Sequence, residues 1–263
     1  MNPTKESYDP RYFEPLFAAE ERHFWFVARN KVICALARKI LGQTQNASIL
    51  EVGCGTGNVL QALEAEFPEA ELVGMDLFQE GLQFAHRRVQ CGLVQADLSH
   101  PPFKRPVDLL GMFDVLEHIQ NDMDVLSQAE KLIKPGGWLL LTVPSDPKLW
   151  SYFDVASHHV RRYSEKELSD KVQETGFKLD FVSPYIAGTY PLVWLTRNAR
   201  ENTGSSGADS VESRAEDELK IIPVVNEILR GILSLEAGWL SGRRRLPFGS
   251  SLVLMAQKPF ILT

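Results

Sequence analysis

The stretch Ser48-Ile49-Leu50-Glu51-Val52-Gly53-Cys54-Gly55-Thr56-Gly57 joins a short apolar run to three glycines at alternate positions. The apolar run predicts a buried strand. Glycines allow a tight turn after it and let a ligand approach the backbone with no Cβ in the way. A strand-to-helix turn without any ligand is the alternative interpretation, because a G-x-G-x-G pattern alone is weakly specific.

Short apolar runs alternate with helical segments on the carboxyl side of this stretch. Further strands are predicted at residues 72–76, 93–97, 107–113, 138–143, 177–182 and 251–256. Helices are predicted between the earlier strands, and a capping box at Ser164-Glu165-Lys166-Glu167 predicts the start of another, which ends at Gly176. Strands this apolar are typical of a parallel sheet covered on both faces. The predicted fold class is therefore α/β, with a doubly wound sheet.

The two outer parts of the chain have a different pattern. The first forty residues are predicted to be helical, and Gly42 offers a stop. The predicted division is an amino-terminal helical segment at 1–45, a core at 46–184, a helical insertion at 185–248 and a last core strand at 249–263. Within the insertion, residues 202–213 have a loop composition that predicts disorder.

The insertion also carries one apolar helical stripe, formed by Val225, Ile228, Leu229, Ile232, Leu235 and Trp239. We expect this stripe to be buried, and three partners compete for it: a substrate pocket, a second subunit, or a membrane with Arg243-Arg244-Arg245 at its surface. The polar face of the same helix mixes acidic, basic and neutral residues, which disfavours a membrane. A cap over the substrate pocket is favoured, with residues 190–195 as its second wall.

Composition sets broad limits on the 263-residue chain. Its hydrophobic fraction of 44% is an ordinary value for a globular protein. Its formal net charge of −6 disfavours nucleic acid as a partner, because nucleic-acid binding usually needs a basic face. The three cysteines cannot all pair, and we find neither a signal peptide nor a membrane-spanning run, so a cytoplasmic protein is expected.

An acid at the end of the second predicted strand points to a ligand. Asp76 follows Gly57 by 19 residues, close to the spacing at which an acid meets a ribose in nucleotide-binding folds. Asn58 stands where a dinucleotide fingerprint has its third glycine, and a P-loop lysine is missing. These features favour a nucleoside without phosphates, namely S-adenosylmethionine, over a nicotinamide dinucleotide.

Residues 49–57 resemble the glycine motif of class I S-adenosylmethionine-dependent methyltransferases. Four further segments follow in the family's order: Gly74-Met75-Asp76, Asp97-Leu98, Phe113-Asp114-Val115-Leu116-Glu117-His118-Ile119 and residues 132–140. The Leu-Glu-His-Ile segment is most similar to the branch that includes quinone-biosynthesis and other small-molecule methyltransferases. The two ends of the chain, at residues 23–30 and 246–251, resemble a bacterial subgroup of mostly uncharacterised members.

The resemblance implies a Rossmann-like seven-stranded sheet with its last strand antiparallel and an amino-terminal helical lid. It implies S-adenosylmethionine as cofactor and S-adenosylhomocysteine as product. Asp76 would bind the ribose, Leu77 would contact the adenine, and Asp97 would accept from the adenine amine. The implied cofactor-binding residues are Arg29, Gly53, Cys54, Gly55, Gly57, Asp76, Leu77, Asp97, Leu98, Phe113 and Asp114. For Arg29, a solvated helix charge is the alternative.

Three histidines are the catalytic candidates, because a base helps when the acceptor is a hydroxyl. His118 follows the fourth strand, and His158 and His159 follow the fifth. A scaffold histidine and an ordinary polar loop are the respective alternatives, and no metal site is predicted. The predicted reaction is in-line methyl transfer to a small, partly apolar or lipid-like acceptor. The alternatives are a non-catalytic nucleoside-binding protein of the same fold and a nicotinamide-dependent dehydrogenase.

Overall fold

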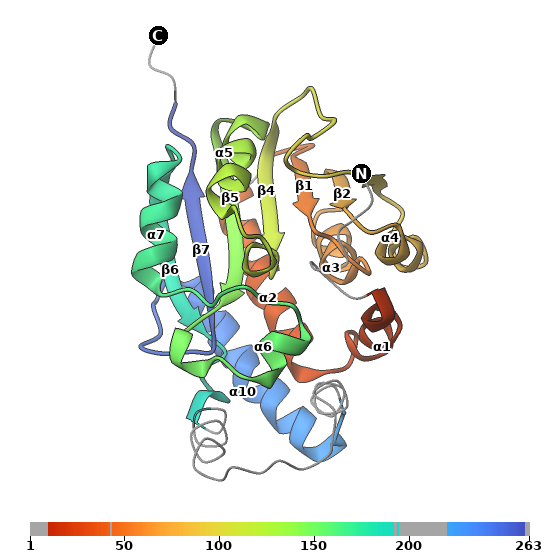
Figure 1. Cartoon of the computed structure of the whole chain (residues 1–263), viewed down its shortest axis with the longest axis vertical. Helices are drawn as coiled ribbons and strands as arrows, with labels where there is room; N and C mark the ends of the chain where they lie inside the picture. Colours follow the sequence, from red (N-terminus) through yellow and green to blue (C-terminus); the bar gives the residue numbers. More distant parts are fainter. Residues whose placement is uncertain (1–9, 43, 192–193, 195–219, 261–263) are drawn as a thin grey trace.

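The computed structural model describes residues 10–42, 44–191, 194 and 220–260, and its described part is built around a seven-stranded sheet (Figure 1). The strands are β1 (Ser48–Val52), β2 (Glu71–Asp76), β3 (Gly92–Gln95), β4 (Val107–Phe113), β5 (Ile133–Pro144), β6 (Lys178–Tyr185) and β7 (Ser251–Gln257). Their order is β3-β2-β1-β4-β5-β7-β6, and β7 runs antiparallel to both neighbours. The predicted fold class and the antiparallel last strand are confirmed.

Helices connect and cover these strands. They are α1 (Phe13–Ala19), α2 (Phe24–Leu41), α3 (Asn58–Glu66), α4 (Gln79–Ala85), α5 (Asp122–Leu132), α6 (Tyr152–Ala156), α7 (Glu165–Glu174) and α10 (Pro223–Ser241), with 3-10 turns η1 (Pro10–Tyr12), η2 (Leu116–His118) and η3 (Pro147–Leu149). No described helix is both long enough and apolar enough to cross a lipid bilayer.

The sheet separates two apolar layers because successive side chains of a strand point to opposite faces. Ile49 of β1 packs with α2, α3 and α10 on one face, whereas the adjacent Leu50 packs with α5 and α7 on the other. Helices on both faces explain why the strands are apolar throughout rather than alternating. They also leave the carboxyl ends of β1 to β4 as the edge where a ligand can approach the backbone.

Local predictions hold at most helix boundaries. Ser164 is the N-cap of α7, and its side chain accepts a hydrogen bond from the Glu167 amide. Gly42 ends α2 with a φ of 56°. The amino-terminal segment, however, forms two helices, α1 and α2, with a turn between them. β5 also starts earlier than predicted, because Ile133 already pairs with Val107 of β4.

The α10 stripe is not buried within the described chain, so the favoured prediction of a cap is not met, whereas a second subunit and a membrane stay open as its partners. Leu235 is 78% exposed and Ile228 58% exposed, and Val225, Ile232 and Trp239 are exposed as well. α10 instead packs on α2 through a second apolar face that includes Leu233 and Leu240. Residues 202–213, for which disorder was predicted, lie outside the described residues, as do residues 192, 193 and 195 of the predicted second wall.

Candidate active site

A cavity of about 490 Å³ lies where the carboxyl ends of β1, β2 and β4 meet α1 and α2. Its polar walls include Glu20, Arg29, Glu51, Asp76, Asp97, Asp114 and His118, and its apolar walls include Phe13, Leu98, Phe113, Val115, Ile119 and Val125. No described residue of α10 lines this cavity, so α10 does not cap it. The size and the mixed walls are typical of a small-molecule site.

The glycine loop between β1 and α3 forms one wall. Gly53, Gly55 and Gly57 have φ angles of 72°, 49° and 78°, which residues with a Cβ rarely adopt. A Cβ on Gly55 would have only a Phe13 ring atom near it, at 3.8 Å, so the backbone there is open to a ligand. Gly57 has a different role: a Cβ there would lie 3.0 Å from Ala85, and the residue does not line the cavity.

Asp76 is held in place by backbone amides at the end of β2. Its Oδ2 accepts from the Gly55 amide at 2.7 Å and its Oδ1 from the Phe78 amide at 2.8 Å. Burial raises the pKa of this carboxyl, and the amide hydrogen bonds oppose that rise. A carboxylate has about four acceptor positions, so these two bonds leave capacity for a ligand hydroxyl.

The guanidinium of Arg29 and the carboxyl group of Glu51 face the cavity next to the glycine loop. The Arg29 Nη1 donates to Asp114 Oδ2 at 2.8 Å, which brings α2 to the end of β4. Glu51 is 2% exposed, and burial raises its pKa well above the usual range. Arg29 Nε and Glu51 Oε2 are both buried without a hydrogen-bond partner among the described residues. A buried orphan donor and a buried orphan acceptor in one cavity indicate a polar ligand.

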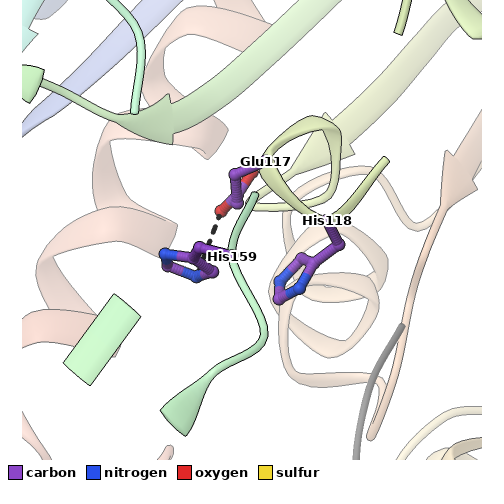
Figure 2. A group of neighbouring side chains, drawn as sticks. All are labelled: Glu117, His118 and His159. Carbon is purple, nitrogen blue, oxygen red and sulfur yellow. Dashed lines mark ion pairs between the residues drawn. The ribbon is translucent and has the colours of Figure 1, made fainter. Parts of the chain in front are cut away.

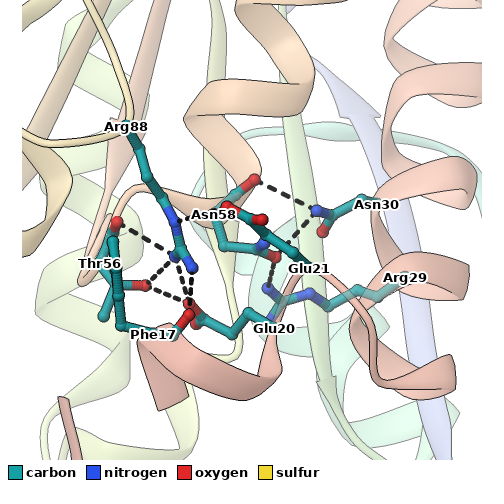
Figure 3. A network of polar contacts seen from close by, with 8 residues as sticks. All are labelled: Phe17, Glu20, Glu21, Arg29, Asn30, Thr56, Asn58 and Arg88. Carbon is teal, nitrogen blue, oxygen red and sulfur yellow. Dashed lines mark hydrogen bonds and ion pairs between the residues drawn. The ribbon is translucent and has the colours of Figure 1, made fainter. Parts of the chain in front are cut away.

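A hydrogen-bond network fastens α1 over the glycine loop (Figure 3). Arg88, which follows α4, donates to the Phe17 carbonyl at 2.6 Å and to the Thr56 hydroxyl at 2.9 Å, and pairs with Glu20. The Thr56 hydroxyl in turn donates to Glu20 at 2.5 Å. α1 therefore forms one wall of the cavity, in the place where a lid was predicted.

The three candidate histidines differ in position. His118 lines the cavity, and burial together with His159 lowers its pKa to about 3. His158 and His159 do not line it. The His159 ring lies 4.8 Å from that of His118, between centroids, and its Nδ1 is 2.9 Å from Asp154 Oδ1. Only His118 is therefore placed to touch a molecule in this cavity.

Every residue predicted to bind the cofactor lines the cavity except Gly57. Residues that the sequence analysis missed also line it: Phe13, Glu20, Glu51, Asn58 and Phe78. Glu51 carried a usable signal, since it is a carboxylate inside an otherwise apolar strand. Phe13 carried none, because only the packing of α1 brings it to the strand ends.

Comparisons with known proteins agree with this geometry. A family described as "Methyltransferase domain" matches residues 24–181. A trans-aconitate 2-methyltransferase of Azoarcus sp. (strain BH72) is 30% identical over 117 residues, which are 44% of this chain and 44% of that protein. A ubiquinone biosynthesis O-methyltransferase of Bordetella avium (strain 197N) is 26% identical over 133 residues, covering 48% of this chain and 54% of that protein.

The fold also resembles a solved structure, the plantazolicin methyltransferase BpumL in complex with S-adenosylhomocysteine. The TM-score is 0.61 at 14% identity, over 95% of this chain and 90% of that one. The chain spans about half the length of the curated relatives that it matches.

Proposed function

The chain belongs to the class I S-adenosylmethionine-dependent methyltransferases, and we propose that it transfers a methyl group from S-adenosylmethionine to a small, partly apolar molecule. The observation that carries this proposal is the pair of orphan groups beside the glycine loop. Arg29 Nε offers a buried hydrogen-bond donor and Glu51 Oε2 a buried hydrogen-bond acceptor in one cavity. That arrangement suits the carboxylate and ammonium of an amino acid.

The other walls suit the rest of the same molecule. Asp76 has acceptor capacity for ribose hydroxyls, and Leu77 and Leu98 provide apolar surface beside it for a purine. Asp97 lies next to them, where it would accept from an exocyclic amine. Bound S-adenosylmethionine would supply a methyl group activated on a sulfonium. The residues of the chain would hold this group and exclude water from it.

The acceptor would bind at the end of the cavity beyond β4. Phe113, Val115 and Ile119 line that end with apolar side chains, and His118 adds one polar group. His118 stays neutral at pH values near 7 because its pKa is lowered to about 3. We therefore assign to it the orientation of the acceptor. Alignment of the two reactants would supply most of the rate enhancement.

The names of the relatives suggest which acceptors to try first. One curated relative is named for trans-aconitate, a carboxylate acceptor, and another for O-methylation in ubiquinone biosynthesis. The apolar lining near His118 favours a phenol with an apolar substituent over a tricarboxylate. Turnover is measured as S-adenosylhomocysteine formed with a panel of phenols and carboxylic acids. Binding of S-adenosylmethionine without turnover of any acceptor or cell extract would favour the non-catalytic alternative.

The assignment of Arg29 and Glu51 is tested with two ligands. S-adenosylhomocysteine carries the amino-acid group, and methylthioadenosine lacks it. We expect Glu51→Gln and Arg29→Lys to weaken S-adenosylhomocysteine binding by about 10-fold or more, as for charge-assisted hydrogen bonds, and to leave methylthioadenosine binding unchanged. Glu80→Gln, an exposed carboxylate of α4, is the control. Equal weakening of both ligands would contradict the assignment.

A further inference from the structure

A second cluster of chemically active side chains lies beside the cavity, where the turn after β4 meets the segment after α6. Glu117, His118 and His159 each offer one ligand atom, and these atoms all lie within 4.8 Å of one another (Figure 2). Glu117 and His118 are adjacent in η2, whereas His159 follows α6 and comes from 41 residues further along the chain. The fold therefore assembles the cluster from two separate segments.

Glu117 lacks the partners that a buried carboxyl group needs. It is 0% exposed, and neither of its carboxyl oxygens has a hydrogen-bond partner among the described residues. Its Oε1 lies 4.0 Å from His159 Nε2, which is too long for a hydrogen bond. Burying an unpaired carboxylate is costly, so a cation at this position would offset a large desolvation penalty.

His159 is oriented as a metal-binding histidine usually is. Its Nδ1 lies 2.9 Å from Asp154 Oδ1, and Asp154 is itself fixed by Arg162 Nε at 2.7 Å and the Ser151 amide at 2.8 Å. This contact leaves Nε2 on the side of Glu117. A carboxylate behind the second ring nitrogen is the common support for an imidazole that ligates a metal.

We propose that Glu117, His118 and His159 bind a divalent transition-metal ion, although no metal site was predicted from the sequence. Two imidazoles and one carboxylate suit Zn²⁺ and its first-row neighbours, whereas Mg²⁺ prefers oxygen ligands alone. Ligands of a tetrahedral Zn²⁺ lie roughly 3.4 Å apart. From the present spacing of up to 4.8 Å, closure needs side-chain movements of about one ångström.

Such an ion would lie next to the acceptor end of the cavity, because His118 belongs to both places. Three protein ligands leave at least one coordination position open. An oxygen donor of the acceptor, such as a phenolic hydroxyl, would fit that position, and this part of the inference rests on the proposed function. The metal site itself does not depend on it.

The experiment measures metal binding by the full chain after treatment with a chelator, in the absence of cofactor and acceptor. We expect one equivalent of Zn²⁺ or Co²⁺ per chain by equilibrium dialysis, a visible Co²⁺ absorption band, and much weaker uptake of Mg²⁺. Glu117→Gln and His159→Ala should each lower the Zn²⁺ affinity by about 10-fold or more. His86→Ala, which removes an exposed histidine outside the cluster, should leave it unchanged.

Several results would overturn the proposal: no Zn²⁺ or Co²⁺ uptake by the wild type, Mg²⁺ bound as tightly as Zn²⁺, or wild-type affinity in both cluster variants. Melting temperatures report whether each variant is folded. If the variants are unfolded, the presence or absence of the visible Co²⁺ absorption band in the wild type tests the proposal. S-adenosylhomocysteine binding is measured on the same preparations. A chain that binds the cofactor but no metal overturns this inference alone, and one that binds metal but not the cofactor overturns the proposed function alone.

Discussion

At the scale of single residues, Asp76 shows how the backbone prepares a side chain for a ligand. Its two carboxylate oxygens are oriented by the amides of Gly55 and Phe78, so little side-chain freedom remains to be lost when a ligand binds. Gly55 occupies this position with a positive φ, which a residue with a Cβ rarely adopts.

We expect Asp76→Ala to weaken S-adenosylhomocysteine binding by about 2–3 kcal/mol, because a charged acceptor of ribose hydroxyls is lost. Isothermal titration calorimetry measures the change, and Glu80→Gln on the exposed side of α4 is the control. Unchanged affinity in a folded Asp76→Ala variant would contradict the assignment of this residue to the ribose.

At the scale of elements, α10 has two apolar faces, of which one is buried against α2 and the other is exposed. Asn226 helps to select the buried one: its Oδ1 accepts from the Phe24 amide at 2.8 Å, and its Nδ2 donates to the Arg22 carbonyl at 2.9 Å. A buried amide that satisfies the first turn of α2 fixes the rotation of α10 about its axis. The opposite face then remains exposed.

Two leucines of α10 allow a matched comparison. Leu233 is 1% exposed and Leu235 is 78% exposed. We expect Leu233→Ala to lower the free energy of unfolding by about 2–4 kcal/mol, because it leaves a cavity against α2. Leu235→Ala should change the free energy by less than about 0.5 kcal/mol. Urea denaturation gives both values, and similar losses would mean that something covers the outer face of α10.

Asp122 joins α5 to α7 through a pH-sensitive contact. Its carboxylate accepts from Lys171 Nζ at 2.7 Å, Arg161 Nη1 at 2.8 Å and the Tyr163 hydroxyl at 2.8 Å. Burial by itself would raise the pKa of this carboxyl, but the bonds from Lys171 and Tyr163 outweigh burial and lower it. A lowered pKa in the folded state means that the ionised form stabilises the fold.

We expect Asp122→Asn to lower the free energy of unfolding by about 2–3 kcal/mol at neutral pH. The difference from the wild type should be constant above pH 5 and should shrink as the pH falls below about 4, the value for an unfolded aspartate. Urea denaturation at a series of pH values checks this. A difference that stayed constant down to pH 3 would contradict the stabilising role of the ionised carboxylate.

At the scale of the whole molecule, the cavity is closed by parts of the chain that lie far apart in sequence. Phe13 and Arg29 come from the amino-terminal helices, whereas Asp76 and Phe113 come from strand ends. A ligand that touches both sides stabilises their contact, because it binds only when they are together. The strands β6 and β7 do not contribute to the cavity.

Hydrogen exchange measures this coupling. With S-adenosylhomocysteine at 100 times its dissociation constant, the added stability is at most about 2.7 kcal/mol, or roughly 100-fold slower exchange. We expect slower exchange in α1 and in the glycine loop, and no comparable change in the outer turns of α10. Protection of the glycine loop without α1 would show that the amino-terminal helix is not a wall of the bound site.

Much of the core was determined by local sequence. The central strands β1, β4 and β5 are largely apolar because both faces of the sheet are buried there, so their positions can be read from residues such as Ile49 and Leu50 without knowing their neighbours. The glycine loop and the Ser164 cap are also local, since each depends on the conformation or hydrogen bonds of residues within one turn.

Other features were decided only by tertiary structure, because they depend on contacts between residues far apart in the chain. The buried face of α10 is chosen by its fit to α2 and by the hydrogen bond of Asn226 to Phe24, 202 residues away. An amphipathic pattern alone cannot rank two apolar faces. His159 likewise reaches Glu117 and His118 only because the segment after α6 folds back toward the end of β4, and nothing in the spacing of these residues indicates that meeting.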